Sequence, residues 1–156
     1  MREVFLFDWG DTLMVDFPDE QGKMCNWDIV EAVDGAAEAL SFLVKRADLY
    51  IATSAAASTE ADILAALARV DLDKYISGCF CKANLGVDKS SASFYSMILA
   101  RLEKEPTQVT MVGDSFKKDI EPALRLRMNV IWLTKDGSTN PEKGIRVVTS
   151  LRELCK

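Results

Sequence analysis

A chain of 156 residues, with 49% apolar and 28% charged side chains, has the length and composition of one ordinary globular domain. Its formal net charge of -5 argues against a surface that binds nucleic acid or an anionic membrane, although a local positive field could still bind an anionic substrate. The sequence has no histidine, which excludes Ser-His triads and histidine-ligated metals and leaves acid–base and metal chemistry to carboxylates, lysine, tyrosine or cysteine.

The first half of the chain predicts two strands and two helices. The strands are short runs rich in β-branched and aromatic residues, and the helices carry apolar residues at helical spacing. In chain order these elements are the strand 4–7, the helix 36–44, the strand 48–53 and a helix from residue 58 or 59 to 69. Asp34 is suited to cap the first helix, while Glu60 and Asp62 fall in the first turn of the second.

The second half continues the alternation. Its expected elements are the strand 75–81, a helix from 90 or 91 to 102, the strand 109–112, the helix 119–127, the strands 130–133 and 146–148, and a helix around residue 151. Pro122 fits the fourth of the chain's helices only within its first turn. Short apolar strands that alternate with helices imply a parallel sheet covered on both faces. We therefore expect an α/β fold, a Rossmann-like three-layer sandwich that forms a single domain over 1–156.

The N-terminus and the cysteines indicate the cellular compartment of the protein. Arg2 and Glu3 precede only four apolar residues, which is not typical of a signal peptide, and no apolar run approaches membrane-spanning length. We expect a cytoplasmic protein with no membrane partner and with reduced thiols. Cys79 and Cys81 could form half of a zinc site, but two further ligands would be needed, so a strand with both cysteines on one face is the favoured interpretation.

Polar side chains gather where several predicted strands end. In parallel sheets of this kind, ligands bind beyond the carboxyl ends of the strands. The candidates are Asp8, Asp11, Thr53, Ser54, Lys89, Asp114 and Asp119. Carboxylates suit Mg²⁺, a carboxylate can attack phosphorus, and an ammonium and a hydroxyl can hold the transferring phosphoryl group. Each residue alone is more typical of a helix cap or a solvated charge, but their order and shared edge favour phosphoryl transfer.

Over nearly its whole length the chain resembles the haloacid dehalogenase superfamily. Four family motifs occur in order, matched by FLFDWGDTL, by YIATS with Thr53, by Lys89 before a helix, and by MVGDSFKKD. The resemblance implies that Asp8 is the nucleophile, that Thr53, Ser54 and Lys89 bind phosphate, and that Mg²⁺ is held by Asp8, the backbone carbonyl of Gly10, Asp114 and Asp119.

One position departs from the family pattern. The second aspartate of the first motif, which in family phosphatases protonates the leaving group and later activates water, falls at Gly10. Loss of such a general acid–base group lowers the rate by about 10²–10⁴-fold. Asp11 is adjacent and is the candidate substitute, although one residue along a tight loop usually directs a side chain elsewhere. Superfamily branches that cleave phosphonates or pump ions also lack an aspartate there, so phosphoryl chemistry stays open.

The chain also lacks room for the inserted cap domain with which family members usually gate the site. Only about two dozen residues separate Thr12 from the helix at Ala36, too few for an ordinary domain. We expect an open site, which suits a large substrate or a lid supplied by a neighbouring subunit of a homo-oligomer. A small flap could come from the apolar residues Phe17, Pro18, Met24 and Trp27.

Three functions remain open. The first is a magnesium-dependent phosphatase that forms an aspartyl-phosphate on Asp8 and acts on a phosphorylated small molecule or macromolecule. The second is a non-catalytic module that binds a phosphorylated partner, which Gly10 favours. The third, a carbon–halogen hydrolase, is opposed by the acid pair Asp114 and Asp119 and by the missing cap.

Overall fold

The computed structural model describes residues 2–135 and 145–156. Within these residues, six strands form one sheet in the order β3-β2-β1-β4-β5-β6, and every neighbouring pair is parallel. The strands are β1 (Glu3–Phe7), β2 (Ala47–Ala52), β3 (Gly78–Phe80), β4 (Val109–Gly113), β5 (Asn129–Leu133) and β6 (Arg146–Val148). The predicted Rossmann-like α/β architecture is confirmed.

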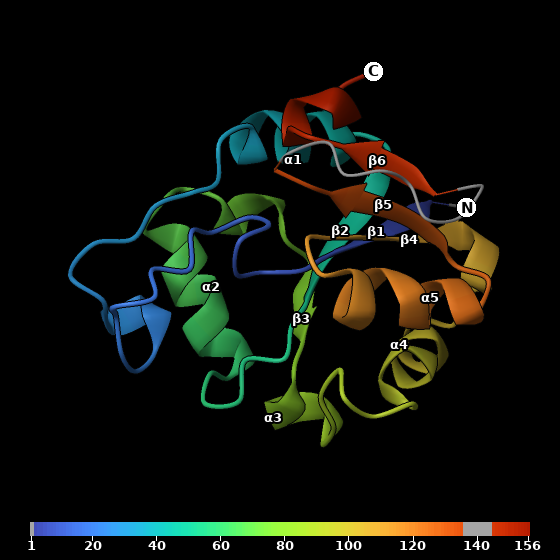
Figure 1. The fold of residues 1–156 in the computed structure, drawn as a ribbon, viewed down its shortest axis with the longest axis horizontal. Helices are drawn as coiled ribbons and strands as arrows, with labels where there is room; N and C mark the ends of the chain where they lie inside the picture. The colour runs from blue at the N-terminus through green and yellow to red at the C-terminus, as the bar shows by residue number, and fades with distance from the viewer. Residues whose placement is uncertain (1, 136–144) are drawn as a thin grey trace.

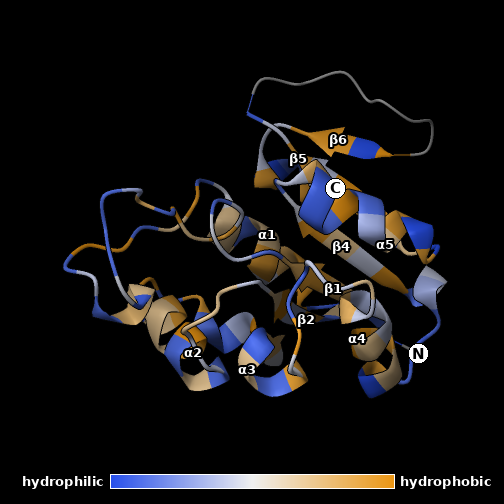
Figure 2. Cartoon of the chain, turned by 60° about the horizontal axis from the view of Figure 1, so that its bottom comes forward, coloured by the Kyte–Doolittle hydropathy of each residue, from blue (hydrophilic) through white to orange (hydrophobic). Residues whose placement is uncertain are grey.

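The sheet is buried on both faces because successive side chains of each strand point to opposite sides. In β1, Phe5 and Phe7 belong to one apolar cluster, whereas Val4 and Leu6 belong to a second. Figure 2 shows that the strands are largely apolar, while the helices also carry hydrophilic residues. A continuous run of apolar residues in the sequence therefore corresponds to a strand covered by helices on both sides.

The helices form the two outer layers (Figure 1). They are α1 (Ala36–Leu43), α2 (Glu60–Ala68), α3 (Lys82–Leu85), α4 (Phe94–Leu102) and α5 (Glu121–Arg125). Buried residues of α1 and α2 join the first apolar cluster, and those of α4 and α5 join the second. In the described residues no helix is both long enough and apolar enough to cross a membrane.

Helix boundaries follow local capping. Thr59 caps α2 as predicted, because its hydroxyl accepts a hydrogen bond from the Asp62 amide while the Asp62 carboxylate accepts one from the Thr59 amide. The prediction that Asp34 caps α1 is wrong. Gly35 precedes that helix with a φ of 86°, and the Asp34 carboxylate instead pairs with Arg152 at 2.8 Å.

Other elements differ from the prediction in length or type. The strand expected from residue 75 is shorter, because a 3-10 turn covers Asp73–Tyr75 before β3 begins. The four-residue helix α3 was not predicted, since so short a segment has no apolar periodicity. The predicted C-terminal helix is a 3-10 turn, Leu151–Leu154. The helix expected over 119–127 starts earlier, as a π-helix over Phe116–Ile120 that continues into α5, where Pro122 lies in the first turn.

Candidate active site

Three aspartates converge at the carboxyl edge of the sheet. Asp8 directly follows β1 and Asp114 directly follows β4, and these strands are neighbours in which Phe7 pairs with Val112. Asp119 lies in the π-helix after β4. One carboxylate oxygen from each aspartate lies within 4.8 Å of the other two. The predicted meeting of these residues at one edge therefore occurs. Adjacent parallel strands that end together place Asp8 beside Asp114, and the π-helix places Asp119 against them.

Lys89 lies at the centre of this cluster. Its Nζ donates hydrogen bonds to Asp8 Oδ1 and to Asp119 Oδ1, both at 2.7 Å, and only 2% of its side chain is exposed. Its backbone amide donates to Ser54 Oγ at 3.1 Å, which ties this loop to the end of β2. Burial lowers the pKa of Lys89, but the charges of Asp8 and Asp119 outweigh it and raise that pKa, so the side chain stays an ammonium.

The three carboxyl groups differ in proton affinity. Burial acts to raise the pKa of Asp8, yet the charge of Lys89 and hydrogen bonds from Asp114 and Lys89 hold it below its ordinary value. Burial, reinforced by Asp8, raises the pKa of Asp114 to about 7. Burial likewise raises the pKa of Asp119 to about 6, against the attraction of Lys89. Asp8 thus remains a carboxylate, the form that can act as a nucleophile.

The donor set fits a hard divalent cation. Three carboxylates share one ammonium, so the cluster holds a surplus of negative charge in a largely buried place. This surplus is one of the reasons why the pKa values of Asp114 and Asp119 are raised. A cation of the Mg²⁺ type, which prefers oxygen ligands, would remove it. Asp8, Asp114 and Asp119 could hold the ion, and Gly10, whose carbonyl was the fourth predicted ligand, lines the same cavity.

Three residues with hydroxyl groups, Thr12, Thr53 and Ser54, surround the carboxylate cluster. Thr12 Oγ1 lies 3.4 Å from Asp8 Oδ2 and 3.3 Å from Asp114 Oδ1, so one buried hydroxyl bridges two of the carboxylates. Thr53 Oγ1 accepts a hydrogen bond from the Ala55 amide at 3.1 Å. Thr53 and Ser54 line the cavity that also contains Asp8 and Lys89, at the strand edge where the sequence placed them.

The turn after β1 explains what Asp11 does. Asp11 has a φ of 60°, and its Oδ1 accepts a hydrogen bond from the Asp16 amide at 3.0 Å. Its carboxylate therefore braces the loop, although the residue lines the cavity. Asp16 lies at the same cavity, and burial together with the charges of Asp11 and Asp8 raises its pKa. Sequence reasoning missed Asp16, because nothing in the local pattern shows that the loop returns to Gly10.

The cavity over these groups has a volume of about 600 Å³. The segment 16–31, called the flap, contributes Asp16, Gly22, Lys23, Met24 and Trp27 to its lining. Met24 and Trp27 line the cavity as suggested by the sequence, while Phe17 packs against Trp27. Arg69, at the end of α2, donates to the carbonyl oxygens of Cys25 at 3.3 Å and Asp28 at 3.1 Å and so holds the flap in place.

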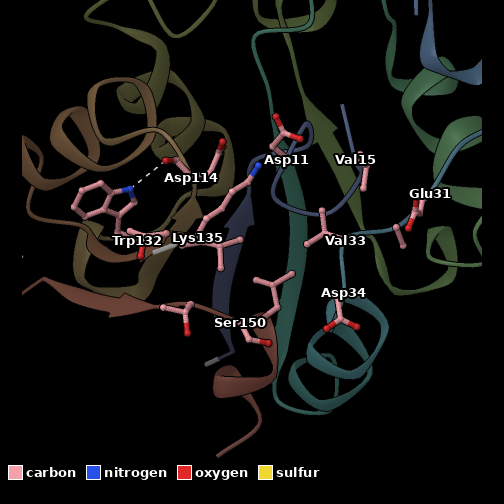
Figure 3. Close-up of a pocket in the computed structure, with 14 residues that line it drawn as sticks. Asp11, Val15, Glu31, Val33, Asp34, Asp114, Trp132, Lys135 and Ser150 are labelled. Atoms are coloured by element: carbon pink, nitrogen blue, oxygen red, sulfur yellow. Dashed lines mark hydrogen bonds between the residues drawn. The ribbon is translucent and has the colours of Figure 1, made fainter. Parts of the chain in front are cut away.

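Two further cavities adjoin the carboxylate cluster. One, of about 520 Å³, shares Asp11 and Asp114 with the first and is shown in Figure 3, where Trp132 Nε1 donates to the Asp114 carbonyl oxygen at 3.1 Å. The other, of about 560 Å³, shares Ser54 and Lys89. The former is lined by four acids, Asp11, Glu31, Asp34 and Asp114, and one cation, Lys135. The latter is lined by four cations, Lys89, Lys117, Lys118 and Arg125, and one acid, Asp88. The open site is therefore flanked by surroundings of opposite charge.

Gly113 is a second residue whose role the sequence did not reveal. A Cβ built on it would lie 2.1 Å from Asp119 Oδ2 and 2.5 Å from Asp119 Cβ. Asp119 thus occupies the space that any side chain at residue 113 would need, and its Oδ2 also accepts a hydrogen bond from the Ser115 amide at 3.1 Å. The sequence signal for this close approach was the glycine directly before Asp114, the aspartate at the end of β4.

The cysteines take no part in this site. Cys79 and Cys81 both belong to the first apolar cluster, while Phe80 between them belongs to the second, so both thiols lie on the same side of the sheet. Only Cys79 lies within β3, because the strand ends at Phe80 and Cys81 caps α3. Burial, followed by the charge of Glu60, raises the pKa of Cys79 to about 12. In the described part of the chain, the three aspartates are the one cluster of potential metal ligands.

Comparisons with known proteins agree with this geometry. A sequence model of the haloacid dehalogenase-like hydrolases matches residues 8–126, which include all the aspartates of the cluster. No curated protein matches the chain.

Among solved structures, an uncharacterized protein from Listeria monocytogenes serotype 4b has a TM-score of 0.82 at 20% identity, with 97% of this chain and 93% of that chain covered. A HAD phosphatase from Thermococcus onnurineus has a TM-score of 0.76 at 17% identity, covering 99% and 96%. A putative HAD-hydrolase from Bacillus subtilis, solved with bound magnesium, has a TM-score of 0.75 at 15% identity, covering 98% and 96%. At these identities the likeness establishes a shared fold.

Proposed function

Because this chain belongs to the haloacid dehalogenase-like hydrolase family, we propose that it is a magnesium-dependent phosphatase that acts through an aspartyl-phosphate on Asp8. The observation that carries the proposal is the buried ammonium of Lys89, held at 2.7 Å from both Asp8 and Asp119, with Asp114 completing a three-carboxylate cluster. Hydrolysis of a phosphorylated small molecule or macromolecule is the reaction that this arrangement serves best.

Each group then has a defined task. The Asp8 carboxylate attacks phosphorus, and its lowered pKa keeps it ionised for that step. The Lys89 ammonium neutralises charge on the phosphoryl oxygens, while the Thr53 and Ser54 hydroxyls at the cavity wall bind them. Magnesium, held by Asp8, Asp114, Asp119 and the Gly10 carbonyl, would supply further neutralisation and orientation of those oxygens. Thr12 keeps the Asp8 and Asp114 carboxylates adjacent.

A non-catalytic phosphate-binding module is the second candidate, and one observation favours it. Gly10 offers no carboxylate at the position that family phosphatases use for proton transfer. Phosphate and magnesium could therefore bind without turnover. A carbon–halogen hydrolase is disfavoured, because it needs no metal, whereas the surplus charge of the three carboxylates suits a cation.

Hydrolysis of 4-nitrophenyl phosphate, measured with magnesium and with EDTA, tests the proposal. We expect turnover that depends on magnesium, because the aryl leaving group departs without needing a proton. The Asp8→Asn variant should lose turnover entirely, since the amide cannot form the covalent intermediate. Asp19→Asn, a change of the same kind at an exposed loop position outside the cavities, is the matched control and should keep full activity.

Two outcomes would count against a phosphatase. Retained hydrolysis in Asp8→Asn would remove Asp8 as the nucleophile. Binding of inorganic phosphate by the wild-type protein, with no hydrolysis of the aryl ester, would support the binding module instead.

A further inference from the structure

The space beside Gly10 is occupied by another carboxyl group. A Cβ built on Gly10 would lie 3.4 Å from Asp16 Cβ and 3.5 Å from Asp16 Oδ2, which is ordinary van der Waals contact. The φ of Gly10 is not positive, so the backbone there would accept a side chain without strain. The Asp16 carboxyl group therefore lies where a side chain at residue 10 would extend.

The loop between these residues is built to return to this point. The amides of Leu13 and Met14 each donate to the Trp9 carbonyl oxygen at 3.0 Å, which closes a tight turn. Asp11 Oδ1 then accepts the Asp16 amide hydrogen bond at 3.0 Å, and this contact fixes the backbone of Asp16 beside the turn. Asp11, the adjacent acid in sequence, thus acts as a brace, and Asp16 is the acid that the turn presents.

Asp16 also has the surroundings that proton transfer requires. It lines the same cavity as Asp8, Thr53 and Lys89, so a substrate over Asp8 would face it. Asp16 is also solvent-exposed, so its carboxyl group can exchange a proton with water. Among the described residues Asp16 forms no ion pair with a cation, in contrast to Asp8 and Asp119, which both pair with Lys89.

We propose that Asp16, supplied by the flap, is the catalytic proton donor and acceptor in place of the side chain missing at Gly10. This inference rests on the proposed phosphatase function. As Asp8 attacks, the bond from phosphorus to the leaving oxygen breaks, and that oxygen takes the proton of the Asp16 carboxylic acid. The Asp16 carboxylate then removes a proton from water, whose oxygen bonds to phosphorus as the bond from phosphorus to Asp8 breaks, which restores both side chains.

Exchange of ¹⁸O between labelled inorganic phosphate and water tests the assignment without knowledge of the natural substrate. Exchange requires formation and hydrolysis of the aspartyl-phosphate, with water or hydroxide as leaving group and nucleophile. We expect Asp16→Asn to slow exchange by about 10²–10⁴-fold, and Asp19→Asn to leave it unchanged. With 4-nitrophenyl phosphate, Asp16→Asn should keep the initial burst of nitrophenolate but accumulate phosphorylated Asp8, visible by mass spectrometry.

The outcomes separate the two proposals. If the wild-type protein neither exchanges label nor cleaves the aryl ester, the phosphatase function fails, and the role of Asp16 fails with it. If the wild-type protein is active and Asp16→Asn exchanges label at the same rate, only the assignment of Asp16 is overturned. Equal loss of the burst and of exchange would also overturn it, because that pattern marks a structural defect.

A residue swap tests the spatial claim directly. Gly10→Asp in an Asp16→Ala background returns a carboxyl group to the space between residues 10 and 16, this time attached to residue 10. We expect the double variant to exchange label at least about tenfold faster than Asp16→Ala alone. Gly10→Asp alone should give no gain, since it brings two carboxyl groups into contact. Absence of recovery in a folded double variant would contradict the equivalence of the two positions.

Discussion

At the scale of single residues, the site depends on places where a side chain is missing as much as on those where one is present. Gly113 lets Asp119 approach the backbone of β4, and Gly10 leaves room for Asp16. The two glycines differ in tolerance. A Cβ at residue 10 would meet its nearest neighbour at 3.4 Å, whereas one at residue 113 would meet Asp119 at 2.1 Å.

Gly113→Ala should therefore damage both the fold and the site. Asp119 must move away, which breaks its 2.7 Å contact with Lys89. Overpacking of this kind lowers stability by about 1–3 kcal/mol, and we expect a matching loss of magnesium affinity. Denaturant unfolding and a magnesium titration measure the two effects. Gly10→Ala is the steric control and should unfold near the wild-type midpoint; an equal loss there would contradict the steric argument.

The sequence placed Asp8 and Asp114 at the carboxyl edge of the sheet because each directly follows an apolar run that is typical of a strand. It did not identify Asp16, since proximity to Gly10 arises from the return of a loop and not from any spacing pattern. Adjacency in sequence places Asp11, the candidate substitute, in a turn with a φ of 60°, where its carboxylate accepts a hydrogen bond from the Asp16 amide. Local patterns predict elements well and loop geometry poorly.

At the scale of elements, the flap is positioned by a helix that takes no part in the chemistry. Arg69 extends from the end of α2 to the flap carbonyl oxygens, and Lys23 on the flap pairs with Asp62 in the first turn of α2 at 2.9 Å. The flap is thus held at both ends of one helix. Because it carries Asp16, Met24 and Trp27 at the cavity, its position sets the shape of one side of the site.

Arg69→Met should loosen the flap while leaving the nucleophile in place. The lost hydrogen bonds involve a charged donor that is exposed, so we expect a stability loss near the low end of the range for such bonds, about 1 kcal/mol. We further expect the Michaelis constant for 4-nitrophenyl phosphate to rise more than kcat falls. Steady-state kinetics and thermal unfolding measure both. Lys74→Met, at an exposed pair with Asp71, is the control; identical kinetics in the two variants would contradict this role of Arg69.

Most elements could be predicted because apolar periodicity and caps are local properties. Thr59 and Asp62 are an example, since their capping box is visible in the sequence itself. The π-helix that carries Asp119 could not be predicted in this way, because its hydrogen bonds span one residue more than those of an α-helix, and apolar spacing over five residues does not reveal this difference. The role of Asp34 could not be predicted either, because its carboxylate pairs with Arg152, which is distant in sequence, instead of capping α1.

At the scale of the whole molecule, the site exists only when the chain is folded. Its acids lie at residues 8, 114 and 119 and its ammonium at residue 89, so segments from both halves of the chain must meet. An unfolded chain has no such cluster, and a metal that binds it therefore stabilises the folded state by mass action.

Magnesium should raise the melting temperature of the protein. At a concentration of 100 times the dissociation constant the gain is about 2.7 kcal/mol, which corresponds to roughly 5–10 °C for a domain of this size. Differential scanning calorimetry with increasing magnesium, followed by EDTA, gives the shift and its reversal. Asp119→Asn removes one negative charge from the cluster and should reduce the shift in melting temperature. A wild-type melting temperature that does not change with magnesium would contradict the cation site.

The carboxylate cluster and the flap belong to separate parts of the chain, and this separation has a practical consequence. Asp8, Asp114, Asp119 and Lys89 are anchored to the sheet edge and the loops beside it. Residues 16–31, in contrast, form one continuous segment held by contacts with Arg69 and Asp62. An engineer could exchange that segment as a cassette between its two anchor points. Under the proposed function, such grafts would change substrate choice and proton transfer together and leave Asp8 and Lys89 unchanged.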